Sequence, residues 1–162
     1  MRTGIGYDIH RLIPTIHNQS IPVGGVAVGC FYRVEAHSDG DVLLHALADA
    51  CLGALALGDI GEWFPDNQPE NKNRSSSEFL VSIIERIHSM GWEIYQCDAV
   101  LILEEPKIAP HRDPIREHIA KLFGIELSSV SVKAKTHEGL GDIGARKAIA
   151  AHAVVTVRER KG

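Results

Sequence analysis

The sequence predicts one α/β (α+β-like) domain over residues 1–162, with a mostly antiparallel or mixed four-stranded sheet covered by helices on one face. Three observations lead to this prediction. Strand-like runs rich in Val and Ile alternate along the chain with stretches of helical periodicity. The chain contains no internal repeat and no linker. Its 162 residues can bury roughly 70% of the unfolded chain's surface in one core.

The first part of the chain is predicted to form two strands and one buried helix. Residues 1–10, MRTGIGYDIH, read as a strand that ends in a polar pair. Residues 20–29, SIPVGGVAVG, have the pattern of a hairpin around a Gly-Gly turn. Residues 41–57 are rich in Ala and Leu and apolar on nearly every face, which predicts a mostly buried helix that ends near Gly58.

The rest of the chain is predicted to contain a surface loop, two helices and three strands. The loop is rich in Pro, Asn and Ser, and glycines close both helices. The predicted elements are the loop 65–77, the helix 78–90 closed by Gly91, the strand 92–105, the helix 110–123 stopped by Gly124, and the strands 130–136 and 148–159.

Composition argues against several classes of protein. The net charge is −4, from 17 basic and 21 acidic residues without a run of like charge, so we expect no nucleic-acid partner. No signal-peptide pattern opens the chain and no window reaches about 18 apolar residues, so we expect a soluble, cytoplasmic protein with no membrane segment. Three widely spaced cysteines, Cys30, Cys51 and Cys97, predict buried thiols and neither a disulfide framework nor a thiolate zinc site.

Asp8, His10 and His45 are candidate metal ligands. Asp8 and His10 are two apart on a predicted strand, so their side chains leave the same face. One carboxylate and two imidazoles make the kind of set that binds catalytic zinc and leaves a fourth position for substrate. From spacing alone, the opposing interpretation is that Asp8 caps a turn and His10 lies on the surface.

The predicted buried helix carries two further acids on the face of His45. Asp41, His45 and Asp49 fall at i, i+4 and i+8, so one carboxylate lies a turn away on each side of the imidazole. A metal-bound histidine usually donates its other N–H to such a carboxylate, and we expect Asp41 or Asp49 to orient His45 in this way. A purely structural salt bridge is the alternative.

The segment His37-Ser38-Asp39-Gly40 precedes this helix. It lacks the alternating acids and the distal glutamate of a calcium-binding loop. We expect a flexible turn in which Ser38 or Asp39 caps the helix, and its place beside the proposed metal makes it a candidate lid.

The run Gly139 to Gly144, GLGDIG, matches a dinucleotide-binding fingerprint, but only 18 residues follow it, too few for the rest of that motif. The remaining interpretation is a mobile glycine-rich loop after residues that can meet a phosphate and its divalent cation. An exposed strand end is an equally simple alternative. The residues in question are Lys133, Lys135, Thr136 and Glu138.

Six short motifs, in this order and spacing, resemble the 2-C-methyl-D-erythritol 2,4-cyclodiphosphate synthase family over residues 1 to about 157. These enzymes of the non-mevalonate isoprenoid pathway close 4-diphosphocytidyl-2-C-methyl-D-erythritol 2-phosphate into a cyclic diphosphate and release CMP. The motifs are Gly4-Ile5-Gly6-Tyr7-Asp8-Ile9-His10, Ala36-His37-Ser38-Asp39-Gly40-Asp41, Gly58-Asp59-Ile60-Gly61, Phe64-Pro65-Asp66, Pro106-Lys107 and Thr136-His137-Glu138.

The resemblance implies a role for each motif. Asp8, His10 and His45 would hold one Zn²⁺, and Glu138 would contact a Mg²⁺ or Mn²⁺ ion on the substrate diphosphate. The other implied contacts are a phosphate lid of His37 and Ser38, a methylerythritol site of Asp59, Gly61 and Asp66, and a cytidine and α-phosphate site of Pro106, Lys107, Ala134, Lys135 and Thr136.

Family members are homotrimers whose sheets face a central axis and whose active sites lie between subunits, so the resemblance implies the same assembly here. Two stretches depart from the family pattern. Gly144-Ala145-Arg146-Lys147-Ala148 stands where members often have Gly-Arg-Gly-Glu-Gly, which removes the arginine that would hold an anionic ligand on the axis. Glu104-Glu105 replaces small or neutral residues before Pro106, beside the cytosine pocket.

The implied reaction needs no protein nucleophile and no general base, because the attacking 2-phosphate is already ionised. Cations and fixed geometry would overcome the repulsion between the phosphates. Two alternatives use the same residues: a zinc-dependent phosphohydrolase that delivers water to phosphorus, and a non-catalytic metal- or nucleotide-binding trimer. The three-ligand count argues against the second, since structural zinc usually has four protein ligands.

Overall fold

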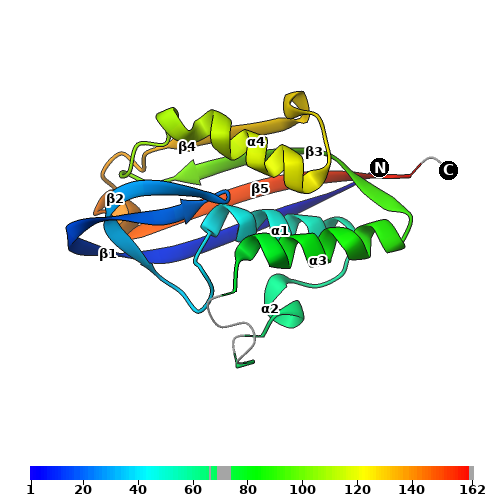
Figure 1. The fold of residues 1–162 in the computed structure, drawn as a ribbon, viewed down its shortest axis with the longest axis horizontal. Coiled ribbons are helices and arrows are strands. Elements are labelled where there is room, and N and C mark those ends of the chain that lie inside the picture. Colours follow the sequence, from blue (N-terminus) through cyan, green and yellow to red (C-terminus); the bar gives the residue numbers. More distant parts are fainter. Residues whose placement is uncertain (66, 69–73, 161–162) are drawn as a thin grey trace.

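The computed structural model describes residues 1–65, 67–68 and 74–160. They form a five-stranded mixed sheet, in the order β2-β1-β5-β3-β4, with the longer helices packed along one face (Figure 1). The strands are β1 (Arg2–Val23), β2 (Val26–Glu35), β3 (Trp92–Ile102), β4 (Val130–Lys135) and β5 (Ala148–Glu159). The helices are α1 (Val42–Ala54), α2 (Ile60–Trp63), α3 (Ser76–Ser89), α4 (Arg112–Phe123) and α5 (Gly141–Gly144).

The α/β class and the mixed sheet are confirmed, but the prediction of four strands is wrong. β1 continues past His10, pairing with β5 through Arg11 and with β2 from Arg11 to Val23. Gly24 and Gly25 then turn the chain with positive φ angles of 59° and 79°, as the hairpin pattern predicted. The second strand of the hairpin, β2, therefore forms the edge of the sheet, and all five strands expected along the chain join one sheet instead of four. β3 and β4 run parallel, and all other neighbouring strands are antiparallel.

Most helix and strand boundaries agree with the sequence analysis. β5 spans 148–159, and α4 ends at Gly124, whose φ is 65°. α1 ends at Ala54, earlier than predicted, and α3 begins at Ser76, inside the predicted loop, because Ser75 caps it. Of that loop, residues 66 and 69–73 lie outside the described residues.

The run from Gly139 to Gly144 is also more regular than predicted. Gly141–Gly144 forms the short helix α5, and the backbone N–H of Leu140 donates to the carbonyl of His137. The expected irregular glycine loop is therefore a hydrogen-bonded turn followed by a helical turn.

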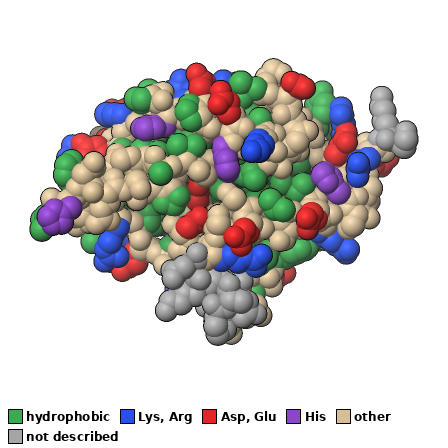
Figure 2. All heavy atoms as spheres, in the orientation of Figure 1, with side chains coloured by type: hydrophobic (Ala, Val, Ile, Leu, Met, Phe, Trp, Pro, Cys, Tyr) green, Lys and Arg blue, Asp and Glu red, His purple; other side chains and the backbone are tan. Residues whose placement is uncertain are grey.

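The helix-bearing face carries mixed charges. Figure 2 shows acidic and basic side chains interspersed over the described part of this face. The longest described helix, α3, has 14 residues, and no described helix is long and apolar enough to cross a membrane.

Two glycines allow α1 to lie directly on β1. Along β1 the buried positions alternate with exposed ones, and Gly4 and Gly6 face the helix. A Cβ atom at Gly4 would lie 2.1 Å from the carbonyl oxygen of Ala50, and one at Gly6 would lie 1.9 Å from that of Ala46. Helix and strand therefore meet backbone to backbone, which brings the start of α1 over the next inward-facing residues of β1.

We predict that Gly6→Ala destabilises the fold by about 3 kcal/mol or more, because its methyl group would overlap the Ala46 carbonyl and neither backbone can move alone. Urea denaturation measures the loss. The matched control is Gly53→Ala on α1, where the new Cβ would lie 3.7 Å from its nearest neighbour, the carbonyl oxygen of Ile5. That control should be neutral or stabilising by up to about 1 kcal/mol. Equal stability of the two variants would contradict the close-packing argument.

Candidate metal centre

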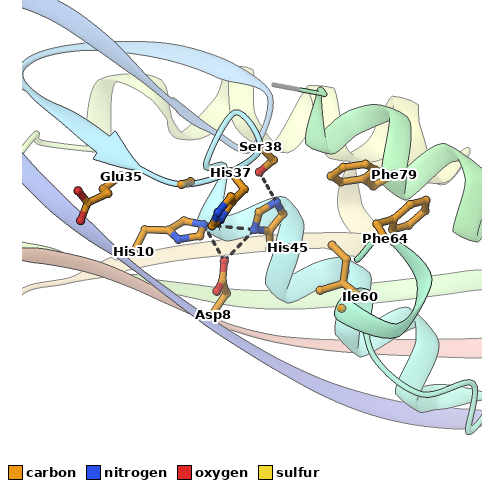
Figure 3. A pocket seen from close by; sticks show the side chains of 11 residues that line it. Asp8, His10, Glu35, His37, Ser38, His45, Ile60, Phe64 and Phe79 are labelled. Atoms are coloured by element: carbon orange, nitrogen blue, oxygen red, sulfur yellow. Dashed lines mark hydrogen bonds and ion pairs between the residues drawn. The ribbon is translucent and has the colours of Figure 1, made fainter. Parts of the chain in front are cut away.

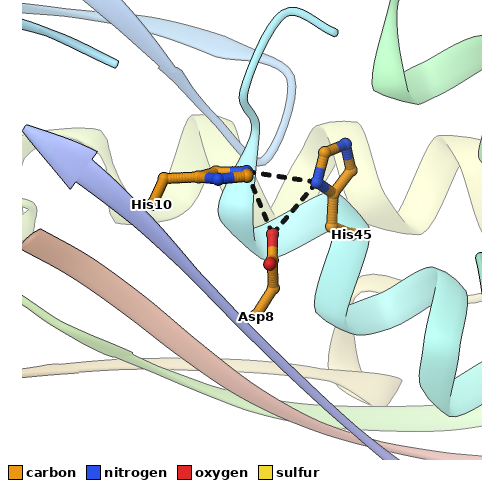
Figure 4. A group of neighbouring side chains, drawn as sticks. All are labelled: Asp8, His10 and His45. Atoms are coloured by element: carbon orange, nitrogen blue, oxygen red, sulfur yellow. Dashed lines mark hydrogen bonds and ion pairs between the residues drawn. The ribbon is translucent and has the colours of Figure 1, made fainter. Parts of the chain in front are cut away.

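The structure brings Asp8, His10 and His45 together (Figure 4). Asp8 Oδ2 lies 3.1 Å from His10 Nε2 and 3.0 Å from His45 Nδ1. The two histidine nitrogens are 3.2 Å apart. All three candidate ligand atoms lie within 4.8 Å of one another, so a single ion could reach each of them.

Local structure explains this convergence. Asp8 and His10 follow Gly4 and Gly6 on the inward face of β1, where side chains recur at every second residue. His45 lies in the first turn of α1, the end of the helix that the glycines bring over these side chains. The triad therefore lies just past the close backbone contact, where β1 again carries side chains on the face toward α1.

The electrostatics of the triad favour an ionised carboxylate. Burial alone would raise the pKa of Asp8, but hydrogen bonds and charge from His10 and His45 outweigh it and lower that pKa well below its ordinary value. Burial would likewise lower the pKa of His45, yet Asp8, Asp41 and Asp39 raise it. The ionised carboxylate is ready to bind a divalent cation, whereas His45 has to lose the proton that its raised pKa favours when a metal binds.

The triad opens into a pocket of about 340 Å³ (Figure 3). His37, Ser38 and Gly61, all expected near the substrate, are on its wall. Two stacked aromatic rings, Phe64 and Phe79, with centroids 4.4 Å apart, close the side away from His10. The full lining is Asp8, His10, Glu35, Ala36, His37, Ser38, His45, Ile60, Gly61, Phe64 and Phe79.

Ser38 stands beside the triad on the loop that precedes α1 (Figure 3). Its Oγ lies 3.2 Å from His45 Nε2 and accepts a hydrogen bond from the Gly40 N–H at 3.2 Å. Ser38, one of the two residues expected in a lid, therefore lies beside the candidate metal ligand His45.

Asp41 caps α1, so the prediction that Ser38 or Asp39 is the cap is wrong. The Asp41 side chain is fully buried. At 2.6 to 3.1 Å it accepts hydrogen bonds from the backbone N–H groups of Gly24, Gly25, Leu43 and Leu44. Burial raises the pKa of Asp41, even though these bonds oppose that shift. Asp41 therefore joins the β1–β2 turn to the start of α1.

The expectation that Asp41 or Asp49 orients His45 is also wrong. Asp41 is committed to the backbone groups named above, and Asp49 Oδ1 accepts from the N–H of Ile60 at 2.8 Å. Burial raises the pKa of Asp49. Asp49 lies one turn beyond His45 on α1, but its carboxylate turns to the start of α2 and positions the pocket residues Ile60 and Gly61.

The remaining expected methylerythritol contacts are placed only in part. Asp59 is exposed and caps α2, accepting a hydrogen bond from the Glu62 N–H at 3.0 Å. Gly61 lines the pocket of the triad. Asp66 lies outside the described residues.

The expected nucleotide residues line a different pocket, of about 190 Å³. Pro106, Lys107, Ala134, Lys135 and Thr136 all contribute to it. In the described residues, no side chain lines both this pocket and that of the triad. One chain therefore holds two separate sets of candidate site residues.

Glu138 lies beyond both pockets. It is exposed, has a φ angle of 51°, and its Oε1 accepts a hydrogen bond from Thr136 Oγ1 at 2.9 Å. Glu104 stabilises the turn that contains Glu138, since its Oε1 accepts hydrogen bonds from the N–H groups of His137 and Gly139 at 2.9 and 3.2 Å. Glu105 pairs with Arg146 at 3.4 Å. Glu104 thus supports the turn that carries Glu138, and Glu105 pairs with the segment that follows α5.

Two polar side chains near the triad were not expected there from the sequence: Ser76, and Asp39, which was expected only as a possible helix cap. Ser76 Oγ lies 2.8 Å from His45 Nε2 and also hydrogen-bonds the Asp39 carboxylate. Ser76 belongs to a Ser-Ser-Ser run that has the composition of a surface loop. Only its position at the start of an apolar helical pattern could have indicated a buried serine.

Comparison with known proteins gives one consistent family. The model described as "YgbB family" matches residues 1–158. A 2-C-methyl-D-erythritol 2,4-cyclodiphosphate synthase of Treponema denticola is 50% identical over 151 residues, which is 93% of this chain and 92% of the relative.

Solved structures give the same result. The CDP complex of IspF from Plasmodium falciparum superposes with a TM-score of 0.86 at 36% identity, covering 99% of this chain and 97% of that chain. The bifunctional IspDF from Campylobacter jejuni has a TM-score of 0.91 at 34% identity, covering 98% of this chain and 42% of that longer one. The likeness therefore extends over the whole sheet and its helices.

We predict that Asp41→Ala lowers the free energy of unfolding by about 2–4 kcal/mol, because four backbone N–H groups lose their acceptor, two of them at the helix start. Urea denaturation measures this loss. The control is the ordinary cap of α3, Ser75→Ala, which should cost about 1 kcal/mol. If Asp41→Ala cost no more than Ser75→Ala, Asp41 would be a simple helix cap without a role in holding the hairpin turn.

Proposed function

The chain belongs to the YgbB family of 2-C-methyl-D-erythritol 2,4-cyclodiphosphate synthases, and from this premise we propose how its residues bind and cyclise the substrate. The enzyme converts 4-diphosphocytidyl-2-C-methyl-D-erythritol 2-phosphate into 2-C-methyl-D-erythritol 2,4-cyclodiphosphate in the non-mevalonate isoprenoid pathway. An oxygen of the 2-phosphate forms a bond to the β-phosphorus. The bond from that phosphorus to the bridging oxygen breaks, and CMP leaves with the electron pair.

The convergence of Asp8, His10 and His45 at one pocket carries this proposal, and we assign the three residues as ligands of zinc. Donor atoms about 2.0–2.2 Å from a tetrahedral zinc ion lie roughly 3.3 Å from one another. The observed separations of 3.0 to 3.2 Å need only a small expansion to fit. Zinc, when bound, supplies Lewis-acid stabilisation of charge on the β-phosphate oxygens.

Residues around the triad bind and orient the phosphate and methylerythritol groups. His37 and Ser38 close over the phosphates as a lid, with the Ser38 hydroxyl already beside His45. Asp59, Gly61 and Asp66 hold the methylerythritol part through its hydroxyl groups. The attacking 2-phosphate is already ionised, so no residue of the chain has to act as its general base.

The second pocket binds the CMP part of the substrate. Pro106 and Ala134 offer apolar contact to the base and sugar, while Lys107, Lys135 and Thr136 contact the α-phosphate side. Glu138 would contact a magnesium or manganese ion carried by the diphosphate. A single exposed carboxylate suits such an ion, which keeps several waters and relies on substrate phosphates for other ligands.

We further propose a homotrimer in which neighbouring subunits complete each active site. The sheet face opposite the helices exposes an apolar set on β1, with Ile5 72%, Tyr7 48% and Ile9 45% accessible. Apolar surface of this kind is typical of a protein interface. The two sets of site residues occupy separate pockets of one chain, so a neighbouring subunit can supply the nucleotide pocket to the zinc pocket.

We predict about one zinc ion per chain by elemental analysis, and formation of the cyclic diphosphate by phosphorus NMR. His45→Ala should lose the metal and slow cyclisation by at least about 100-fold, because charge stabilisation worth several kcal/mol is removed. His88→Ala, at the far end of α3, is the control and should keep both properties. Full zinc retention by His45→Ala would contradict the ligand assignment, and an open monophosphate product would identify a hydrolase.

We also predict a mass near three times 17.7 kDa by sedimentation, with activity recovered when inactive His45→Ala and Lys107→Ala subunits exchange. If subunits mix at random, about one quarter of interfaces combine an intact zinc pocket with an intact nucleotide pocket. The control pairs His45→Ala with Ser38→Ala, whose lesions share one pocket and which should not rescue each other. A monomer, or equal recovery in both mixtures, would contradict a site shared between subunits.

A further inference from the structure

We propose that Ser76 and Asp39 position the metal ligand His45 through a hydrogen-bonded relay, an inference that rests on the zinc site proposed above. His45 is held from two sides. Its Nδ1 faces Asp8 and His10, at 3.0 and 3.2 Å, so its Nε2 points away from the candidate metal position. The relay begins at this second nitrogen.

The tautomer of His45 fixes the direction of the first hydrogen bond. A neutral histidine that binds a metal through Nδ1 carries its proton on Nε2. Nε2 lies 2.8 Å from Ser76 Oγ and 3.2 Å from Ser38 Oγ. Ser76 therefore offers the shorter acceptor for this proton.

The hydroxyl proton of Ser76 then has one charged acceptor. Ser76 Oγ hydrogen-bonds Asp39 Oδ1, and an ionised carboxylate can only accept. Ser76 is 1% exposed, and among the described residues the only other buried polar or charged side chain is Asp41, the cap of α1. A buried serine at the start of α3 is thus explained by the histidine and the carboxylate that its hydroxyl joins.

Asp39 is itself held in place. Its Oδ2 accepts from the Ser76 N–H at 3.0 Å, and its Oδ1 accepts from the Asp41 N–H at 3.2 Å. Its own N–H donates to the carbonyl of Arg74 at 3.3 Å. The carboxylate is therefore fixed between the loop before α1 and the start of α3. It takes, through a hydroxyl group, the orienting role that the sequence suggested for Asp41 or Asp49.

The relay also gives Ser76 and Ser38 different roles. Because Ser76 accepts the Nε2 proton of His45, Ser38 can turn from His45 to a substrate phosphate without leaving that N–H unpaired. We accordingly assign Ser76 as a positioning residue and Ser38 as a substrate contact.

The test compares three serines in one turn, Ser75→Ala, Ser76→Ala and Ser77→Ala. Zinc affinity is measured by chelator competition, and the ligand geometry by the visible absorption of the cobalt-substituted protein. Ser76→Ala should bind zinc about 10- to 100-fold more weakly and shift the cobalt bands. Ser75 caps α3 and Ser77 contacts His118, so both controls should match the parent in affinity and spectrum even if their stability falls.

Asp39→Asn provides the second arm and should weaken zinc binding in the same direction. The double variant with Ser76→Ala should bind no more weakly than Ser76→Ala alone, because Asp39 acts on His45 through Ser76. Parent-like affinity and spectrum in Ser76→Ala would overturn the relay while leaving the zinc site standing. If that variant does not fold, parent-like affinity in Asp39→Asn overturns it. A parent protein without bound metal would overturn the zinc site and the relay together.

Discussion

The backbone contact between α1 and β1 sets the geometry on which the site depends. Gly4 and Gly6 leave no room for a side chain beneath Ala46 and Ala50, so strand and helix approach as closely as two backbones can. Asp8 is the next inward-facing residue of the same strand. From Asp8 onward, side chains of β1 again lie between the strand and α1, and the pocket next to His45 begins there. The distance between the candidate ligands on β1 and α1 is thus set by two glycines that are not themselves candidate ligands.

Two carboxylates near the start of α1, those of Asp41 and Asp39, bond to different groups because their surroundings differ. Asp41 is fully buried and meets four backbone N–H groups, so it satisfies the helix end and the hairpin turn. Asp39 is half-buried, and its carboxylate lies on the hydroxyl of Ser76, next to His45. The two acids before this apolar helix therefore have separate partners: Asp41 holds the helix to the hairpin turn, and Asp39 reaches the candidate ligand His45 through the Ser76 hydroxyl.

The two pockets are built by different halves of the chain. The first half of the sequence builds the pocket of the triad, and the second half builds the pocket of Lys107 and Lys135. The sheet joins the two halves through the β5 strand, which pairs with β1 on one side and β3 on the other. The sheet keeps the two pockets at a fixed separation, as the proposed sharing of one active site between neighbouring subunits requires. The apolar uncovered face of that sheet is consistent with such an assembly.

The sequence by itself determined the class of fold, nearly all the elements and the candidate metal ligands. Strand alternation places Asp8 and His10 on one face, and motif order identifies the family, because both are properties of residues close in the chain. Tertiary structure decided that all five strands join one sheet, which groups Asp41 and Asp49 bond to, and that Ser76 contacts His45. Helical spacing puts Asp41, His45 and Asp49 on one face, but a carboxylate bonds to whichever donors a neighbouring element brings within reach. Those donors come from the β1–β2 turn and the start of α2, just as the serine that contacts His45 comes from α3, 31 residues along the chain.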